Sequence, residues 1–188
     1  MKIILASTSI RRRELLSELK IDFTIKEPVC DEDLDFHTNP KEKVENLSYI
    51  KAKSVFNKEE DSLVIGADTV VVFENEIFGK PKDLEEAKKM LSTLSGKTHS
   101  VITGITFITK NKSITESVVS KVKFKNLTKN DIEEYVNHFN VLDKAGSYAI
   151  QDGQVVESFE GSYSNVVGLP MERTKEILKE SELWLGIE

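Results

Sequence analysis

Residues that form disulfides or thiolate metal sites are scarce in this sequence. Cys30 is the only cysteine among the 188 residues, which excludes an intramolecular disulfide. No histidine lies close to Cys30 in the sequence, so we interpret it as an unreactive thiol rather than as a nucleophile. His37, His99 and His138 are scattered, without a metal-binding spacing such as Cys-x-x-Cys or His-Glu-x-x-His. A zinc-type motif is therefore not predicted.

Long apolar runs and an excess of positive charge are also missing. The apolar run near the N-terminus covers only residues 3–6 and is soon followed by Arg11-Arg12-Arg13. This run is too short for a membrane span, and its order differs from that of a signal peptide, so we expect a cytoplasmic protein without a membrane partner. The 26 basic and 32 acidic side chains give a net charge of −6, which argues against a general nucleic-acid binder. Local basic groups could still bind a small anionic substrate.

The composition is that of a folded α/β protein. Hydrophobic residues make up 39% and charged residues 31% of the chain, so a substantial core can form. We predict a single domain over residues 1–188, with a mixed sheet and flanking helices, because strands and helices do not alternate strictly. Strands are predicted at 2–6, 23–25, 63–65, 69–73, 101–109 and 114–124, helices at 11–19, 40–56, 84–94, from 129 and at 171–181, and an irregular stretch at 143–169.

Asp68 is a carboxylate inside the most apolar segment of the sequence. Valine and isoleucine lie on both sides of it, a pattern typical of a strand that is buried on both faces. An ionised carboxylate in such a strand is unfavourable unless it is paired or binds a cation. Gly66 suggests a bulge beside the carboxylate, so we interpret Asp68 as functional. The alternative is an aspartate that ends the strand by capping its loop.

The turn Ser7-Thr8-Ser9 connects the first strand to the first helix. Its hydroxyl groups and the free N–H groups of the helix N-terminus form a natural anion site. Arg11, Arg12 and Arg13 follow in the first helical turn, where the helix dipole disfavours cations, so they indicate a bound anion. The turn is not a P-loop, because the Gly-x-x-x-x-Gly-Lys pattern is absent. A solvated basic helix start is the alternative.

Two lysines and an acidic segment are further candidates. Lys51 lies on the apolar stripe of its helix, where a lysine either extends to solvent or meets an anion. Lys80 lies between Gly79 and Pro81, in a turn that would hold a cation in place, although a plain surface turn explains it equally well. Residues 31–35 carry four carboxylates that could bind a hard cation, whereas most acidic loops are simply solvated.

Motifs along the whole chain resemble those of the Maf family of nucleoside triphosphate pyrophosphatases. In order they are Leu5-Ala6-Ser7-Thr8-Ser9-Ile10-Arg11-Arg12, Lys51-Ala52, Gly66-Ala67-Asp68-Thr69-Val70-Val71, Gly79-Lys80-Pro81-x-Asp83, Leu94-Ser95-Gly96-x-Thr98-His99, Asp143-Lys144-Ala145-Gly146-Ser147-Tyr148-x-Ile150-Gln151 and Glu160-Gly161-Ser162-Tyr163-x-Asn165-Val166-Val167-Gly168-Leu169-Pro170. Ile10 replaces the usual proline, and Ala149 stands where glycine is common. Neither departure removes a polar group.

The resemblance implies a fold and a reaction. The fold would be an α/β structure of two lobes around a deep cleft, of the inosine triphosphatase type, in a family whose members often form homodimers. The reaction would be hydrolysis of a nucleoside triphosphate to the monophosphate and pyrophosphate, assisted by Mg²⁺ or Mn²⁺. Asp68-Thr69 with Ile150-Gln151 is similar to the subgroup that acts on dTTP and UTP. The alternatives are a preference for 7-methyl-GTP, or a nucleotide-binding regulator of septum formation without catalysis.

The resemblance also implies roles for individual residues. Asp68 would be the general base and, with Glu32, a metal ligand. The phosphates would be bound by Lys51, Lys80 and Arg12, with help from Ser7 and Ser9. The positions that distinguish substrate subgroups would be Arg11, Thr69 and Gln151. Which of Asp31, Glu32 and Asp33 reaches the metal stays open.

Overall fold

The computed structural model describes residues 1–30, 39–59 and 61–180. The strands are β1 (Lys2–Ala6), β2 (Phe23–Lys26), β3 (Ser62–Phe73), β4 (Glu76–Phe78), β5 (Thr98–Ile108), β6 (Ser113–Phe124) and β7 (Val156–Glu160). The helices are α1 (Ile10–Ser17), α2 (Pro40–Phe56), α3 (Leu84–Leu94), α4 (Lys129–His138), α5 (Tyr163–Val167) and α6 (Met171–Glu180), with two 3₁₀ turns, η1 (Ala145–Ser147) and η2 (Ile150–Asp152). None of the described helices is long and apolar enough to cross a membrane.

The seven strands in the described part of the chain form one mixed sheet. Its order is β2-β1-β3-β5-β6-β7, and β4 pairs with the far end of β3. β1 is parallel to both of its neighbours, whereas the pairs from β3 to β7 are antiparallel. The predicted α/β fold with a mixed sheet and flanking helices is confirmed.

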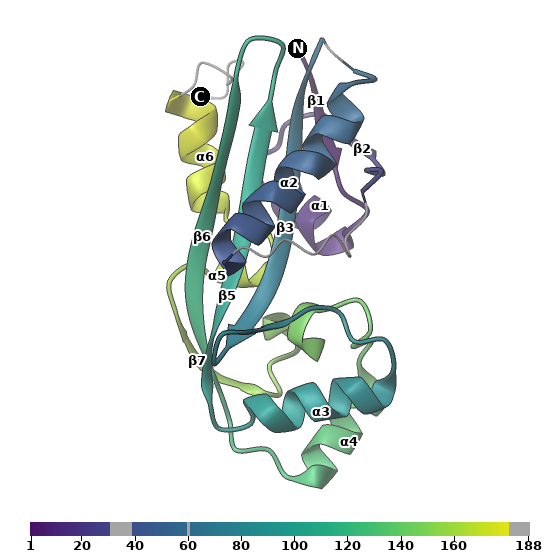
Figure 1. The fold of residues 1–188 in the computed structure, drawn as a ribbon, viewed down its shortest axis with the longest axis vertical. Helices are drawn as coiled ribbons and strands as arrows, with labels where there is room; N and C mark the ends of the chain where they lie inside the picture. The colour runs from purple at the N-terminus through teal and green to yellow at the C-terminus, as the bar shows by residue number, and fades with distance from the viewer. Residues whose placement is uncertain (31–38, 60, 181–188) are drawn as a thin grey trace.

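The long strands β3, β5 and β6 run through two lobes (Figure 1). The large lobe comprises β1, β2, α1, α2 and α6, and the small lobe comprises β4, α3, α4, η1 and η2. One apolar cluster joins α1 and α6 to the sheet in the large lobe, and a second joins α3 and α4 to the other end of the sheet. Because the same strands contribute to both clusters, we propose that residues 1–188 form a single domain.

The small-lobe core contains a buried histidine. His99 is 3% exposed, and its Nε2 lies 2.7 Å from the hydroxyl oxygen of Tyr148. The rings of Phe124 and Tyr148 pack edge-on against it, with centroids 5.0 and 5.4 Å from that of the imidazole. Burial lowers the pKa of His99 to about 4, so the ring is neutral in the folded protein at neutral pH.

The carboxyl end of β1 is a branch point of the sheet. β2 and β3 flank β1 on opposite sides, and the connecting helices α1 and α2 pack on opposite faces. β3 pairs with β1 as far as Gly66 and with β4 from Val71 onward. Within the described residues no strand covers this edge of β3 at positions 67–70. Ligands of open α/β sheets bind outside the carboxyl ends of strands at such points.

β3 runs without interruption past Asp68, so the predicted bulge at Gly66 is wrong. Residues 64–72 pair with β5 in one continuous register. The glycine is needed for packing instead: a Cβ on Gly66 would lie 2.4 Å from the backbone oxygen of Ser48 in α2. A Cβ on Gly104 of β5 would lie 2.2 Å from the backbone oxygen of Val44. These two glycines allow α2 to lie directly on the sheet.

Most other predicted elements are confirmed, with one stretch as the exception. The helices α2, α3 and α4 begin near their predicted first residues, and their N-caps Asn39, Asp83 and Thr128 each accept a hydrogen bond from the backbone N–H three residues later. Residues 143–169, predicted to be irregular, contain η1, η2, β7 and α5. These elements are three to five residues long, too short to show a helical or strand period in the sequence.

Candidate active site

Lys51 and Asp68 form a buried ion pair between α2 and β3. The Lys51 Nζ donates a hydrogen bond of 2.7 Å to Asp68 Oδ1, and the two side chains are only 7% and 11% exposed. Lys51 therefore meets an anion and does not extend to solvent. Asp68 Oδ2 accepts no hydrogen bond from any described residue. One carboxylate oxygen thus remains for a ligand at the uncovered edge of β3.

Thr69 points to the opposite face of β3, because successive side chains of a strand alternate. There it accepts a hydrogen bond of 3.1 Å from Arg12 Nη2. The same guanidinium donates from Nε to the backbone oxygen of Gly168 (2.8 Å) and from Nη1 to Ser7 Oγ (3.4 Å). Arg12 therefore connects α1, the end of β1, β3 and the residue after α5. Asp68 and Thr69 approach the uncovered edge from its two faces.

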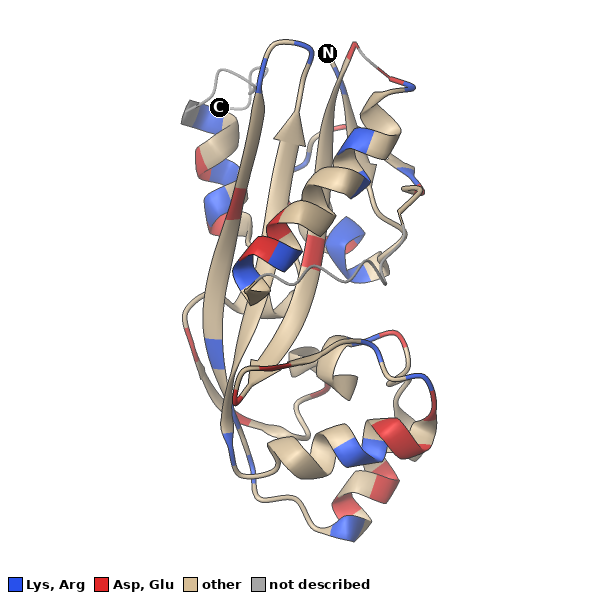
Figure 2. Cartoon of the chain, viewed as in Figure 1, with Lys and Arg blue, Asp and Glu red and all other residues tan. Residues whose placement is uncertain are grey.

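The turn between β1 and α1 is held by its own serines. Ser9 caps α1 and accepts from the Arg12 N–H at 3.4 Å, and Ser7 Oγ accepts from the Ser9 N–H at 3.2 Å. Both side chains thus organise the backbone of the turn. In Figure 2 much of the ribbon of α1, which this turn begins, has the blue of Lys and Arg. The predicted grouping of the turn with Arg12 is present, and anion binding there stays a prediction.

Arg11 bonds to a different part of the molecule from its neighbour Arg12. Its Nη1 and Nη2 donate to Oδ2 and the backbone oxygen of Asp143, at 3.1 and 3.2 Å. Burial tends to raise the pKa of Asp143, but Lys144 and Arg11 outweigh this effect and hold the pKa below its ordinary value. Only Lys144 separates Asp143 from η1, so this ion pair joins α1 of the large lobe to the small lobe.

Lys80 and Gln151 lie on turns of the small lobe with exposed side chains. Lys80 follows β4, and the Gly146 N–H donates to the backbone oxygen of the adjacent Gly79 at 3.0 Å. Gln151 is the middle residue of η2. Asp68 makes no hydrogen bond to either residue within the described structure. Neither of these two predicted site residues is therefore bonded to Asp68 in the described structure.

A tyrosine of α4 holds η2 in place through two hydrogen bonds. The Tyr135 hydroxyl donates to Asp152 Oδ2 at 2.5 Å and accepts from the Ala149 N–H at 3.1 Å. Burial, followed by the Asp152 carboxylate, raises the pKa of Tyr135, so the hydroxyl keeps its proton. The two residues that flank Ile150 and Gln151 are thus bonded to one buried side chain.

The predicted metal ligand Glu32 lies outside the described residues, as do Asp31 and Asp33. Among residues 1–30, 39–59 and 61–180, no group of three or more histidine, cysteine, aspartate or glutamate side chains could hold a metal ion. Asp68 supplies a carboxylate oxygen at the edge of β3. This donor set fits a cation such as Mg²⁺, which takes one or two carboxylates and completes its shell with phosphate oxygens and water.

Two buried polar residues near Thr69 were not predicted as parts of the site. Thr103 of β5 lies directly opposite Thr69, with the two hydroxyl oxygens 2.9 Å apart, and it donates to the backbone oxygen of Asn165 at 3.1 Å. Threonine is common in strands, so the sequence alone gives no reason to assign Thr103 to the site. Asn165 lies in the Gly161-Ser162-Tyr163-Ser164-Asn165 segment, which matches a family motif but was given no role in the site.

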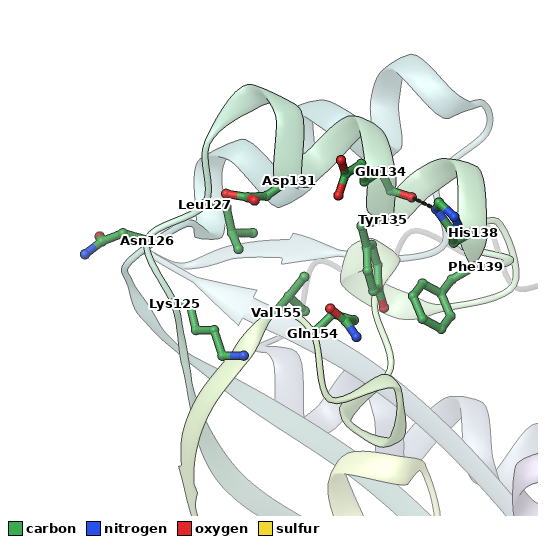
Figure 3. A pocket seen from close by; sticks show the side chains of 10 residues that line it. All are labelled: Lys125, Asn126, Leu127, Asp131, Glu134, Tyr135, His138, Phe139, Gln154 and Val155. Atoms are coloured by element: carbon green, nitrogen blue, oxygen red, sulfur yellow. Dashed lines mark hydrogen bonds between the residues drawn. The ribbon is translucent and has the colours of Figure 1, made fainter.

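A pocket of about 420 Å³ lies against α4 in the small lobe (Figure 3). It is lined by Lys125, Asn126, Leu127, Asp131, Glu134, Tyr135, His138, Phe139, Gln154 and Val155. None of the predicted site residues is among them. This pocket is therefore separate from the candidate active site.

The fold and these contacts define a class: α/β proteins with a paired carboxylate and an arginine-bound turn where a parallel strand ends. A search of solved structures finds the Ham1 protein of Staphylococcus aureus, with a TM-score of 0.54 and 15% identity over 97% of this chain and 100% of that one. This likeness supports the predicted fold. The model of the family described as "Maf-like protein" matches residues 2–181. The chain belongs to the Maf family.

Relatives with an assigned activity cover nearly the whole chain. A dTTP/UTP pyrophosphatase of Thermosipho africanus is 52% identical over 95% of this chain and 92% of its own length. Enzymes of the same name from Thermotoga maritima and Clostridioides difficile are each 45% identical. The alignments cover 98% and 96% of this chain, and 91% and 95% of those proteins.

Proposed function

We propose that this chain hydrolyses dTTP and UTP to the nucleoside monophosphate and pyrophosphate. The observation that carries the proposal is the buried Lys51–Asp68 pair beside the uncovered edge of β3. Relatives at 45–52% identity bear the name of this activity over almost their full length. The reaction needs a carboxylate beside bound phosphates, and this edge supplies one.

Asp68 orients a water molecule and accepts its proton as that water attacks the α-phosphorus. The Lys51 ammonium holds Asp68 Oδ1 in place, so the other oxygen is left for the water. General-base catalysis of this kind depends on such fixed geometry. The bond that breaks joins the α-phosphorus to the bridging oxygen, and pyrophosphate leaves with that oxygen.

Cations on both lobes bind the triphosphate in this proposal. Arg12 and the N–H groups after Ser7 and Ser9 lie at the end of β1, and Lys51 lies beside Asp68. Lys80 would approach from the small lobe. Positioning and charge neutralisation of this kind supply most of the catalysis in phosphoryl transfer.

A divalent cation, Mg²⁺ or Mn²⁺, would be held by Asp68 and Glu32 together with substrate phosphates. When bound, it would lower the pKa of a water and neutralise charge on the leaving pyrophosphate. The unused oxygen of Asp68 supports this assignment.

Base selection is assigned to Thr69, Gln151 and Arg11. Thr69 lies at the edge of β3, and Gln151 is exposed on η2. Arg11 connects the two lobes through Asp143, so it could respond to a nucleoside bound between them. A cytoplasmic location, a homodimer and the absence of a nucleic-acid partner remain predictions.

The test is to incubate the protein with Mg²⁺ and, separately, with dTTP, UTP, CTP and 7-methyl-GTP. We expect pyrophosphate and the monophosphate from dTTP and UTP. Asp68→Asn should lower turnover by roughly 10²–10⁴-fold, because the water loses its base. Asp61→Asn, the same change at an exposed position, is the matched control. Binding without turnover, or turnover of 7-methyl-GTP alone, would contradict the proposal.

A further inference from the structure

A row of three hydrogen bonds leads from the surface of the site into the protein interior. Arg12 Nη2 donates to Thr69 Oγ1 at 3.1 Å, the Thr69 and Thr103 hydroxyl oxygens lie 2.9 Å apart, and Thr103 Oγ1 lies 3.1 Å from the backbone oxygen of Asn165. Each hydroxyl group has one proton to donate and two lone pairs that accept. The direction of every bond in the row can therefore be worked out.

The direction is set from the interior outward. The backbone oxygen of Asn165 can only accept, so Thr103 donates its single proton there. Thr103 must then accept from Thr69, which donates its own proton inward. One lone pair of Thr69 is already used by Arg12. The Thr69 hydroxyl is left with one lone pair and no proton for a ligand.

Burial prevents this arrangement from reversing. Thr103 and Asn165 are both 0% exposed, so solvent offers neither of them another partner. The Asn165 side chain is fixed as well, because its Nδ2 donates to the Val101 backbone oxygen at 3.2 Å and to Ser120 Oγ at 2.9 Å. An unpaired polar group at this depth would be costly. Rotation of the Thr103 hydroxyl away from Asn165 is therefore disfavoured.

We propose that Thr103 is a positioning residue that fixes the Thr69 hydroxyl as a hydrogen-bond acceptor and thereby selects nucleobases that present a donor. Uracil and thymine carry an N–H at ring position 3, whereas cytosine has an unprotonated, accepting nitrogen there. A hydroxyl that can only accept a hydrogen bond pairs with the N–H of uracil or thymine. It cannot pair with the cytosine nitrogen, which is itself an acceptor. The inference rests on the proposed function, in which Thr69 faces the base.

The test compares kcat/KM for UTP and CTP in matched variants at position 103. Thr103→Val keeps the side-chain shape but frees the Thr69 proton, which can then be donated to cytosine. We expect the UTP-to-CTP ratio to fall roughly tenfold, since a mispaired buried polar group is what separates the two bases. Thr103→Ser keeps the hydroxyl and should keep the ratio within about twofold. A general loss of packing would instead lower both rates together and leave the ratio unchanged.

A double-mutant cycle shows whether Thr103 acts through Thr69. Thr69→Val removes the acceptor itself and should also lower the ratio, and adding Thr103→Val should then change the ratio no further. Thr69→Val also serves alone if Thr103→Val does not fold, because Thr69 is only half-buried. An unchanged ratio in either single variant, with UTP still hydrolysed, overturns the inference and leaves the proposed function intact. Failure of the wild-type protein to hydrolyse UTP overturns both.

Discussion

The large and small lobes contribute to the candidate site in different ways. In the large lobe the site residues are bonded to one another: Lys51 to Asp68, and Arg12 to Ser7 and Thr69. In the small lobe Lys80 and Gln151 have exposed side chains on turns. The described bonds thus fix the large-lobe residues to one another, whereas the small-lobe residues lie on exposed turns. The lobes are expected to respond differently to mutation.

The largest effect is expected from breaking the Lys51–Asp68 pair of the large lobe. Lys51→Met leaves a buried carboxylate without its partner, so the free energy of unfolding should fall by about 3–5 kcal/mol. Urea unfolding measures this fall in the free energy of unfolding. The variant should also no longer release pyrophosphate from dTTP. Lys41→Met, on the exposed start of α2, is the control. A change in stability below about 1 kcal/mol would show that the pair contributes little.

Acid should weaken the small lobe through His99. Its pKa is about 4 in the folded protein and 6.5 when unperturbed, so between these values only the unfolded chain binds the proton. Stability should therefore fall as the pH drops from 6.5 to 4, by about 3 kcal/mol in total. The measurement is the unfolding free energy against pH for wild type and His99→Phe. If both show the same slope in this window, His99 is not responsible.

Loosening η2 should affect substrate binding more than turnover. Tyr135→Phe removes the hydroxyl that bonds to Ala149 and Asp152 on either side of Gln151. We expect KM for dTTP to rise roughly tenfold, since losing the two bonds of this hydroxyl should cost about 1.4 kcal/mol, while kcat stays within about twofold. Tyr49→Phe, at an exposed position of α2, is the control. A fall in kcat at unchanged KM would place Tyr135 with the catalytic residues of the large lobe.

The smallest effect is expected from the one ion pair described between the lobes. Asp143→Asn weakens the bond from Arg11, but the Asp143 side chain is 50% exposed, so the coupling should be below about 1 kcal/mol. We expect KM to change by less than about fivefold, and the difference from wild type to vanish at high salt. A change that persists in high salt would indicate a role beyond surface electrostatics.

The parts of the fold with a strong local pattern could be predicted from the sequence. The apolar residues on both sides of Asp68, for example, predict the strand that the structure shows as β3. The pairing of Lys51 with an anion was one of two predicted outcomes, and it is the one found. Gly66 was misinterpreted, because a bulge and a close helix contact both require glycine and the sequence does not distinguish them.

The remaining part of the site depends on tertiary contacts that no local pattern records. Thr103 belongs to the site only because β5 pairs with β3 in a particular register. Arg11 and Arg12 are adjacent and identical in type, yet they bond to different lobes. The assignment of roles to the predicted site residues remains a proposal, and Glu32 lies outside the described residues.

The contact of α2 with Gly66 and Gly104 predicts where the protein will tolerate change. Neither glycine carries a group that could touch a nucleotide, yet any larger side chain at either position would push α2, and with it Lys51, away from Asp68. In a library of variants selected for activity, both positions should accept only glycine. A map of tolerated substitutions would then show Gly66 and Gly104 to be as invariant as Lys51 and Asp68, the ion pair whose contact they allow.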